Sequence, residues 1–314
     1  MGPTRPKRQT LGSVGPGPGG PGFLPRVRLG EAGRMDDRLD RARPAGDAAA
    51  WSDAQLAVTA ALAGAAVLRE LYGTSLRRYE KSAGDFATTA DVEAERAVLA
   101  VLRAARPGDA VTAEESGAGG TAGARRRWLV DPLCGTLNYA ARTALTAVNV
   151  ALRTGDATTA AAVVDPFAGE VFWTDGVRAV LRRDGADEEA APAPGTGLVD
   201  VNLDPPFPHH PAYDAAGLPA APGFAPRFRP RVLSTTLALA WVAAGRRAAY
   251  VTDGGDLRAS VHFAAGIALC GAAGCVVTGI DGRPLDDSAG GLIAAADGDT
   301  HAALVELVAR GRRG

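Results

Sequence analysis

Residues 128–139, WLVDPLCGTLNY, carry the residue types of a metal and phosphate site within one short turn. The apolar residues at the start of this segment predict a buried strand, which ends at Asp131 before a proline. A carboxylate, a free carbonyl and the Thr136 hydroxyl are therefore expected in one small volume. Oxygen atoms of this kind bind hard divalent cations. Backbone N–H groups around Gly135 and Thr136 suit phosphate oxygens.

Two other segments place carboxylates at the ends of expected elements. Asp91 lies in DFATTAD at the start of a predicted helix, and Glu114 follows an apolar strand end at 110–112. Carboxylates at three such ends can converge on divalent ions that take oxygen ligands. Glu95, one turn after Asp91, is expected to be a solvated acid of the first helical turn rather than a ligand.

The elements that position these acids are expected in one domain at 49–314, with lobes at about 49–183 and 184–314. Residues 1–48 are rich in Gly, Pro and Arg and are predicted to be a disordered tail, with Met35 as an alternative start. The first lobe is predicted to contain helices from Trp51 and from near Asp91, then strands at 109–113, 127–131, 145–153, 159–165 and 170–175. The second lobe is predicted to contain strands near 197–202, at 248–251, at 274–278 and at 292–295, and helices from Leu237, at about 259–273 and at 301–309. This succession predicts a layered α/β (α+β) fold.

Bulk properties exclude several classes of protein. The chain has 314 residues, 46% of them hydrophobic, and a net charge of −1, so no nucleic-acid partner is expected. No apolar run is judged long enough to span a bilayer, so no membrane partner is expected either. The three cysteines lack paired metal-type spacing, which fits a reducing cytoplasm. The arginines at 125–127 are predicted to be a solvated turn, with attraction of an anionic ligand as the alternative.

Motifs from all parts of the domain resemble those of the inositol monophosphatase family. DPLCGT is similar to its D-P-[IL]-D-G-T motif, and VHFAAG at 261–266 is similar to its W-D-x-A-A-G motif. RVLSTTLALAWVAAGRRAAYV resembles its G-[ST]-A helix and the strand that follows. The resemblance covers about 51–309. It implies an αβαβα sandwich of the sugar-phosphatase type, Mg²⁺-dependent hydrolysis of a small phosphorylated metabolite, and a homodimer.

The same resemblance implies a role for each candidate residue at the metal ions. Glu114, Asp131 and the Leu133 carbonyl are expected to bind a first Mg²⁺. Asp131 is expected to bridge to a second ion, and Asp91 to hold outer-shell water around a third.

The resemblance also implies how substrate is handled. Thr136 with Glu114 is expected to orient the water that attacks the phosphate monoester. Gly135, Thr136 and Ser234 are expected to contact the substrate.

The chain departs from the family motifs at the second metal ion. Cys134 stands where the motif has its second Asp, and Val261-His262 stands in place of the W-D pair. Three interpretations stay open: catalysis has decayed, one remaining metal supports slow hydrolysis, or Asp131, Cys134 and His262 bind a softer metal such as Zn²⁺. The alternative from another functional class is a catalytically silent protein that binds a phosphorylated metabolite or a partner and regulates it.

Overall fold

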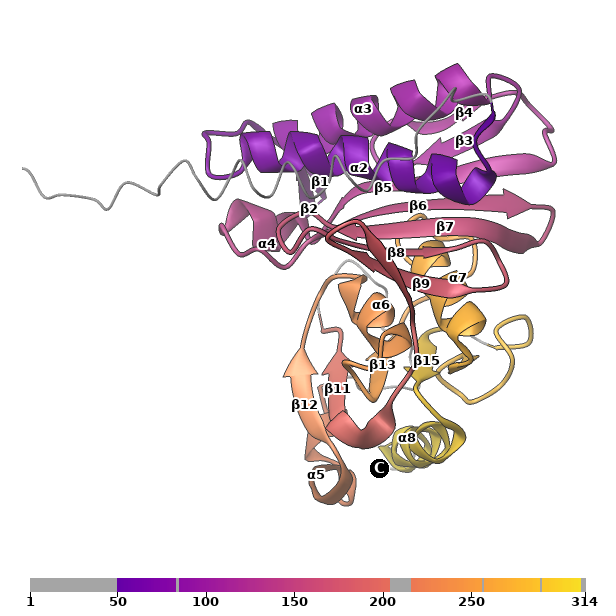
Figure 1. Ribbon diagram of the computed structural model, residues 1–314. Helices are drawn as coiled ribbons and strands as arrows, with labels where there is room; N and C mark the ends of the chain where they lie inside the picture. The colour runs from indigo at the N-terminus through magenta and orange to yellow at the C-terminus, as the bar shows by residue number, and fades with distance from the viewer. Residues whose placement is uncertain (1–49, 83–84, 204–215, 256, 289, 312–314) are drawn as a thin grey trace, which may run out of the picture.

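Five alternating layers of helices and sheets make up the fold (Figure 1). The computed structural model describes residues 50–82, 85–203, 216–255, 257–288 and 290–311, so the predicted tail at 1–48 lies outside the described residues. The α-helices are α2 (Asp53–Leu71), α3 (Thr89–Ala105), α4 (Thr136–Ala140), α5 (Phe224–Arg227), α6 (Leu237–Ala243), α7 (Ala264–Ala273) and α8 (Gly298–Gly311). Short 3-10 helices lie at Pro194–Thr196 and Leu218–Ala220.

The larger sheet has eight strands in the order β10-β9-β8-β7-β6-β5-β3-β4, and its neighbours are antiparallel except for the parallel pair β3 and β5. Its strands are β3 (Ala110–Ala113), β4 (Gly117–Gly120), β5 (Arg126–Cys134), β6 (Ala147–Thr154), β7 (Ala157–Asp165), β8 (Glu170–Thr174), β9 (Ala179–Arg183) and β10 (Ala186–Glu189). Strands β1 (Arg78–Ser82) and β2 (Asp85–Thr88) form a separate antiparallel pair.

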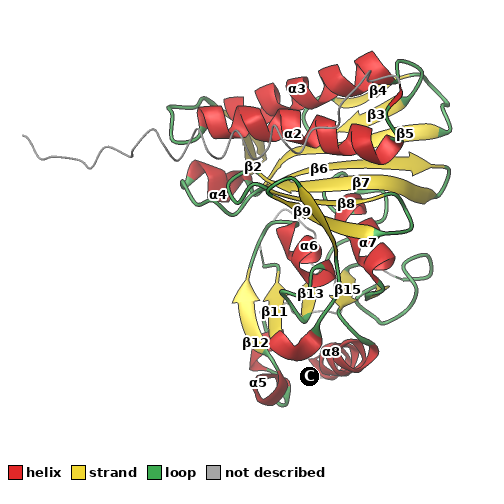
Figure 2. Cartoon of the chain, in the orientation of Figure 1, coloured by secondary structure: helices red, strands yellow, loops and turns green. Residues whose placement is uncertain are grey.

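The smaller sheet has five strands in the order β12-β11-β13-β15-β14. Its strands are β11 (Leu198–Val201), β12 (Arg229–Val232), β13 (Ala249–Thr252), β14 (Val276–Thr278) and β15 (Leu292–Ala295). Loops and short helices join them (Figure 2). The expected lobe boundary at about 184 falls inside the β9–β10 hairpin, because β10 pairs with β9 in the larger sheet.

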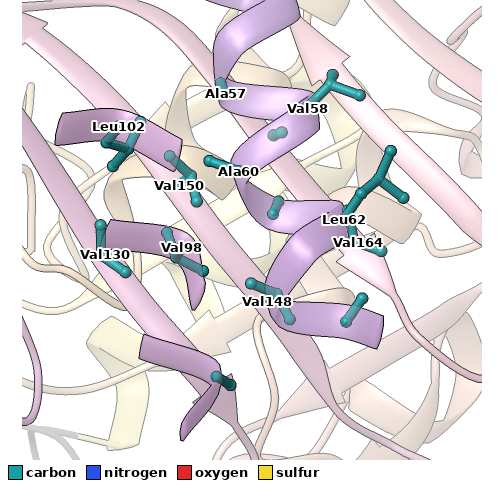
Figure 3. Packing of buried hydrophobic residues seen from close by; sticks show 14 of the residues in the cluster. Ala57, Val58, Ala60, Leu62, Val98, Leu102, Val130, Val148, Val150 and Val164 are labelled. Atoms are coloured by element: carbon teal, nitrogen blue, oxygen red, sulfur yellow. The ribbon is translucent and has the colours of Figure 1, made fainter. Parts of the chain in front are cut away.

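Side-chain alternation along the central strands decides which layer each residue packs against. Val130 on β5 faces the cluster formed with α2 and α3, whereas its neighbour Leu129 faces the cluster formed with α6 and α7. Figure 3 shows Ala57 and Ala60 of α2 among the valines of the sheet. Residues of the smaller sheet face α8 in a third cluster. The predicted αβαβα sandwich is therefore confirmed.

The first helix begins with a side-chain cap. Ser52 is the N-cap of α2 and forms a capping box with Gln55. The apolar run of α2 is long enough to cross a membrane by length and composition, contrary to the expectation from sequence. In the fold, 61% of that run is buried, and the helix packs against α3 and the larger sheet. It therefore has the burial of a core helix.

The close approach of α6 and α7 generates a stability prediction. A Cβ atom on Gly266 of α7 would lie 2.6 Å from Leu239 Cβ of α6, whereas a Cβ on Gly271 meets nothing within 4 Å. Gly266→Ala is expected to lower the free energy of unfolding by about 1–3 kcal/mol through overpacking. Gly271→Ala on the same helix should raise it by about 0.5–1 kcal/mol, because alanine is the better helix former. Urea denaturation of both variants checks this, and equal effects would contradict it.

Candidate active site

A cleft between the larger sheet and the second lobe collects most of the predicted site residues. Its empty volume of about 820 Å³ includes space that is open to solvent. Its lining residues are Asp85, Phe86, Glu114, Leu133, Cys134, Gly135, Thr136, Leu137, Asn202, Ser234, Thr235, Thr236, Tyr250, His262 and Phe263. Asp91 and Asp131 are fully buried behind this lining. The structure thus brings the predicted site residues of both lobes to one place.

The buried end of β5 holds a carboxylate–imidazole pair that joins the two lobes. Asp131 Oδ2 lies 2.8 Å from His262 Nδ1, and Asp131 Oδ1 accepts a hydrogen bond from Leu133 N at 3.1 Å. Burial lowers the pKa of His262, but the charge and hydrogen bond of Asp131, together with the charge of Glu114, outweigh it and raise that pKa to about 9. Burial likewise raises the pKa of Asp131, but the His262 charge and hydrogen bond hold it below its ordinary value. The two side chains therefore form a charged pair at neutral pH.

Glu114 completes a set of potential metal ligands with this pair. One ligand atom from each of Glu114, Asp131 and His262 lies within 4.8 Å of the other two. Glu114 Oε2 is buried and has no hydrogen-bond partner. Burial first, and then the charge of Asp131, raise the pKa of Glu114 to about 8. An orphaned carboxylate oxygen beside a second carboxylate and an imidazole is the donor set that fits a divalent ion.

Lys81, which sequence reasoning missed, lies against the same carboxylate. Its Nζ is 2.9 Å from Glu114 Oε1 and 2.7 Å from Glu115 Oε1. Burial lowers the pKa of Lys81, but the adjacent glutamates outweigh it and raise the pKa above its ordinary value. The composition contains a signal for this residue, because lysine is rare in the chain. Of its 34 Lys and Arg residues, only Lys7 and Lys81 are lysines.

Thr136 is held by a residue at the start of α3. Its Oγ1 lies 2.9 Å from Asp91 Oδ1 and 3.1 Å from the Leu133 carbonyl oxygen. Asp91 Oδ2 accepts hydrogen bonds from Thr88 N at 2.7 Å and Thr88 Oγ1 at 2.6 Å. Asp91 is thus the N3 residue of a capping box whose other member is Thr88. Burial raises the pKa of Asp91. Its second oxygen fixes the Thr136 hydroxyl at the cleft.

Glu95 differs from its prediction as a solvated acid. Its side chain is buried, and its carboxylate accepts hydrogen bonds from Glu115 N at 2.7 Å and Ser116 N at 2.9 Å. The chain that follows β3 turns over the start of α3 and covers Glu95, an arrangement that helical spacing alone does not reveal. Glu95 therefore anchors the segment that carries Glu114.

Cys134 lies in the cleft but outside the ligand group found among the described residues. Its Sγ accepts a hydrogen bond from Thr236 N at 3.3 Å, and burial raises the pKa of the thiol. A register shift between Asp131 and Cys134 in the β5–β6 pairing leaves their partners, Asn149 and Ala147, two residues apart on β6, so both side chains lie on the same face of the sheet. Cys134 therefore lies next to Asp131, while Glu114 supplies the third ligand atom of the group.

Gly135 begins the turn that faces the cleft. Its φ of 98° is in the left-handed region, and it is the N-cap of α4. A Cβ atom there would meet the Leu145 carbonyl oxygen at 2.8 Å. Only glycine therefore fits between β5 and α4. Ser234 enters the cleft from the second lobe, beside the Thr236 that bonds Cys134.

Comparison with known proteins agrees with the motifs and the layers. The sequence model described as "Inositol monophosphatase family" matches residues 52–312. Inositol-1-monophosphatase of Caulobacter vibrioides is 32% identical over 244 residues, which cover 74% of this chain and 91% of that protein.

Solved structures show the same fold. The extragenic suppressor protein suhB of Bartonella henselae superposes with a TM-score of 0.69 at 24% identity, over 82% of this chain and 98% of that chain. The inositol monophosphatase of Anabaena gives a TM-score of 0.62 at 25% identity, over 82% and 95% of the two chains. The family match spans both lobes and all five layers. The chain therefore belongs to the inositol monophosphatase family.

Proposed function

We propose that this protein hydrolyses phosphate monoesters with one divalent ion held by Glu114, Asp131 and His262. The proposal rests on the distances between their ligand atoms, which all lie within 4.8 Å of one another. In addition, Glu114 Oε2 is buried and has no hydrogen-bond partner. The Leu133 carbonyl lies behind Thr136 and is available as a further oxygen ligand. Phosphatase chemistry at this place in the fold follows from family membership.

The donor set favours a softer ion than Mg²⁺. Mg²⁺ prefers oxygen ligands, whereas an imidazole nitrogen suits Zn²⁺ and other transition metals. His262 takes the place of a carboxylate in the family motif, so the group offers two carboxylates and one nitrogen. We therefore propose Zn²⁺ or Mn²⁺ as the working ion, with Mg²⁺ as a weaker substitute. A second ion would lack one carboxylate ligand, because Cys134 replaces the second aspartate of the family motif.

The side chains around the ion have separate tasks in the proposed reaction. A bound divalent ion would polarise the phosphate and lower the pKa of a nearby water. Thr136 can donate its proton to Asp91 and keep a lone pair free to accept a hydrogen bond from the attacking water. Backbone N–H groups at Gly135 and Thr136 would bind phosphate oxygens. Lys81 adds positive charge beside Glu114.

The substrate is proposed to be a small phosphorylated metabolite, because the family acts on such molecules and residues of both lobes line the cleft. The second lobe presents Asn202, Ser234, Tyr250 and Phe263 to the rest of that molecule. A homodimer in the cytoplasm belongs to the same proposal and rests on the family.

A second candidate function is silent binding of a phosphorylated metabolite. The observation that favours it is the presence of protein cations at both carboxylates: His262 pairs with Asp131, and Lys81 pairs with Glu114. These contacts supply positive charge where a metal ion would otherwise lie. In this alternative the cleft binds its ligand without turnover and acts on a partner.

Metal binding separates the two candidates and does not depend on turnover. Glu114→Gln is expected to weaken Zn²⁺ binding by about 10-fold or more, because it removes an anionic ligand. Glu115→Gln is the matched control, since Glu115 also contacts Lys81 but lies outside the ligand group. Competition with a chromophoric chelator measures both affinities. Equal Zn²⁺ affinity in the two variants would reject the proposed metal site.

Metal preference in catalysis tests the role of His262. Phosphate release from a panel of sugar and inositol phosphates should be faster with Mn²⁺ or Zn²⁺ than with Mg²⁺ in the wild type. His262→Asp, alone or with Cys134→Asp, should reverse this order because it restores oxygen ligands. Activity only in the double variant would support the silent candidate. Robust activity with Mg²⁺ in the wild type would contradict the proposed ion.

Thr136 gives a further test of the proposed water-orienting contact. Thr136→Val removes the hydroxyl but keeps the shape, and should lower kcat by about 10²–10³-fold with a smaller effect on KM. Thr136→Ser keeps the hydroxyl bonded to Asp91 and should retain most of the activity. Steady-state kinetics on the two variants check this. A Val variant as active as the Ser variant would remove Thr136 from the mechanism.

A further inference from the structure

The three consecutive arginines at 125–127 do not share one environment. Arg126 forms ion pairs with Asp53 at 2.8 Å and with Asp109 at 2.9 Å. The Arg127 guanidinium donates to Thr112 Oγ1 at 3.1 Å and has no carboxylate within 4.0 Å in the described part of the chain. The Arg125 side chain is exposed. The middle arginine is thus structural, and neither of its two neighbours forms an ion pair within the part of the chain that the structure describes.

A fourth arginine lies directly opposite Arg127. In the antiparallel pairing of β5 with β6, Arg127 is the partner of Arg153. Like charges at such positions destabilise a sheet. Arg153 donates to the backbone carbonyls of Arg258 at 3.2 Å and Asp156 at 2.9 Å. Its nearest carboxylate is that of Asp156, which is 3.9 Å away and fully exposed. The register therefore places two arginines side by side in the sheet, and neither forms an ion pair with a buried carboxylate of the described residues.

These arginines line a second cleft, whose lining residues are Thr112, Ala124, Arg125, Arg127, Leu129, Arg153, Gly155, Asp156 and Ala259. Three arginines and one aspartate give it a formal charge of +2. It shares no residue with the lining of the candidate active site. Arg127 and Asp131 are four residues apart on β5, which corresponds to about 13 Å along the strand. The second cleft is therefore a separate place on the same face of the sheet.

We propose that this cleft is a second anion site that binds a phosphate group, either orthophosphate or the phosphate of a metabolite. The planar guanidinium groups of Arg127 and Arg153 match phosphate oxygens in pairs. Thr112 adds a hydroxyl, and Arg125 adds charge at the mouth of the cleft. A dianion balances the cleft charge and relieves the repulsion across β5 and β6. This site goes beyond the proposed hydrolysis and does not depend on it.

The test is made on the whole chain with chelator present, so that no metal assists binding in the active-site cleft. Orthophosphate is titrated at constant ionic strength while the melting temperature is measured. The wild type should show a saturable rise of about 2–4 °C at a tenfold excess over the dissociation constant. Arg127→Met and Arg153→Met should lose the rise. The matched control Arg96→Met, an exposed arginine on α3, should keep it.

Stability without phosphate separates a binding role from a structural one. Arg127→Met should be no less stable than the wild type in chloride, because it removes a like charge opposite Arg153. A parallel titration with glycerol 2-phosphate shows which source of phosphate binds more tightly. An equal rise with chloride, or a rise retained in both cleft variants, would overturn the proposed site. Either result would leave the proposed hydrolysis untouched, since no metal is present.

Discussion

A carboxylate buried at the end of β5 needs a positive charge beside it, and the architecture of the site follows from this need. Asp131 is fully buried, and an unpaired charge in such a place would cost many kcal/mol. His262 supplies the charge from the segment that leads into α7, so one contact ties the second lobe to the central strand of the first. The cleft lies beside this contact between the two lobes.

The remaining acids of the site are held by partners from their own lobe. Glu95 accepts two backbone N–H groups and anchors the chain around Glu114, while Asp91 caps α3 and holds Thr136. Lys81 reaches Glu114 from a strand pair outside the larger sheet. Each of these carboxylates therefore has a hydrogen-bond or ion-pair partner in its own lobe, but the Oε2 atom of Glu114 has no hydrogen-bond partner. The proposed ion would supply the positive charge that this buried oxygen lacks.

Small side chains allow these layers to approach closely. The core facing α6 and α7 is rich in alanine, and Gly266 lies against Leu239 with no space for a Cβ atom. Protein interiors are packed as densely as organic crystals, so an added atom at such a contact displaces the neighbouring element. The position of α7, and of His262 just before it, therefore depends on glycine at this crossing.

The amino-acid sequence by itself determined the periodic elements and the family. The strand at 292–295 has the predicted bounds, and α2 and α3 begin within two residues of the helix starts predicted at Trp51 and near Asp91. The sequence did not reveal β4, whose GAGG residues are all exposed, or the polar β10, because neither has apolar alternation. Only the tertiary structure showed that Glu95 is buried and that Lys81 meets Glu114. It alone showed that His262 joins the expected pair of Glu114 and Asp131 while Cys134 stays outside the ligand group, since a contact between the lobes decides which side chains meet.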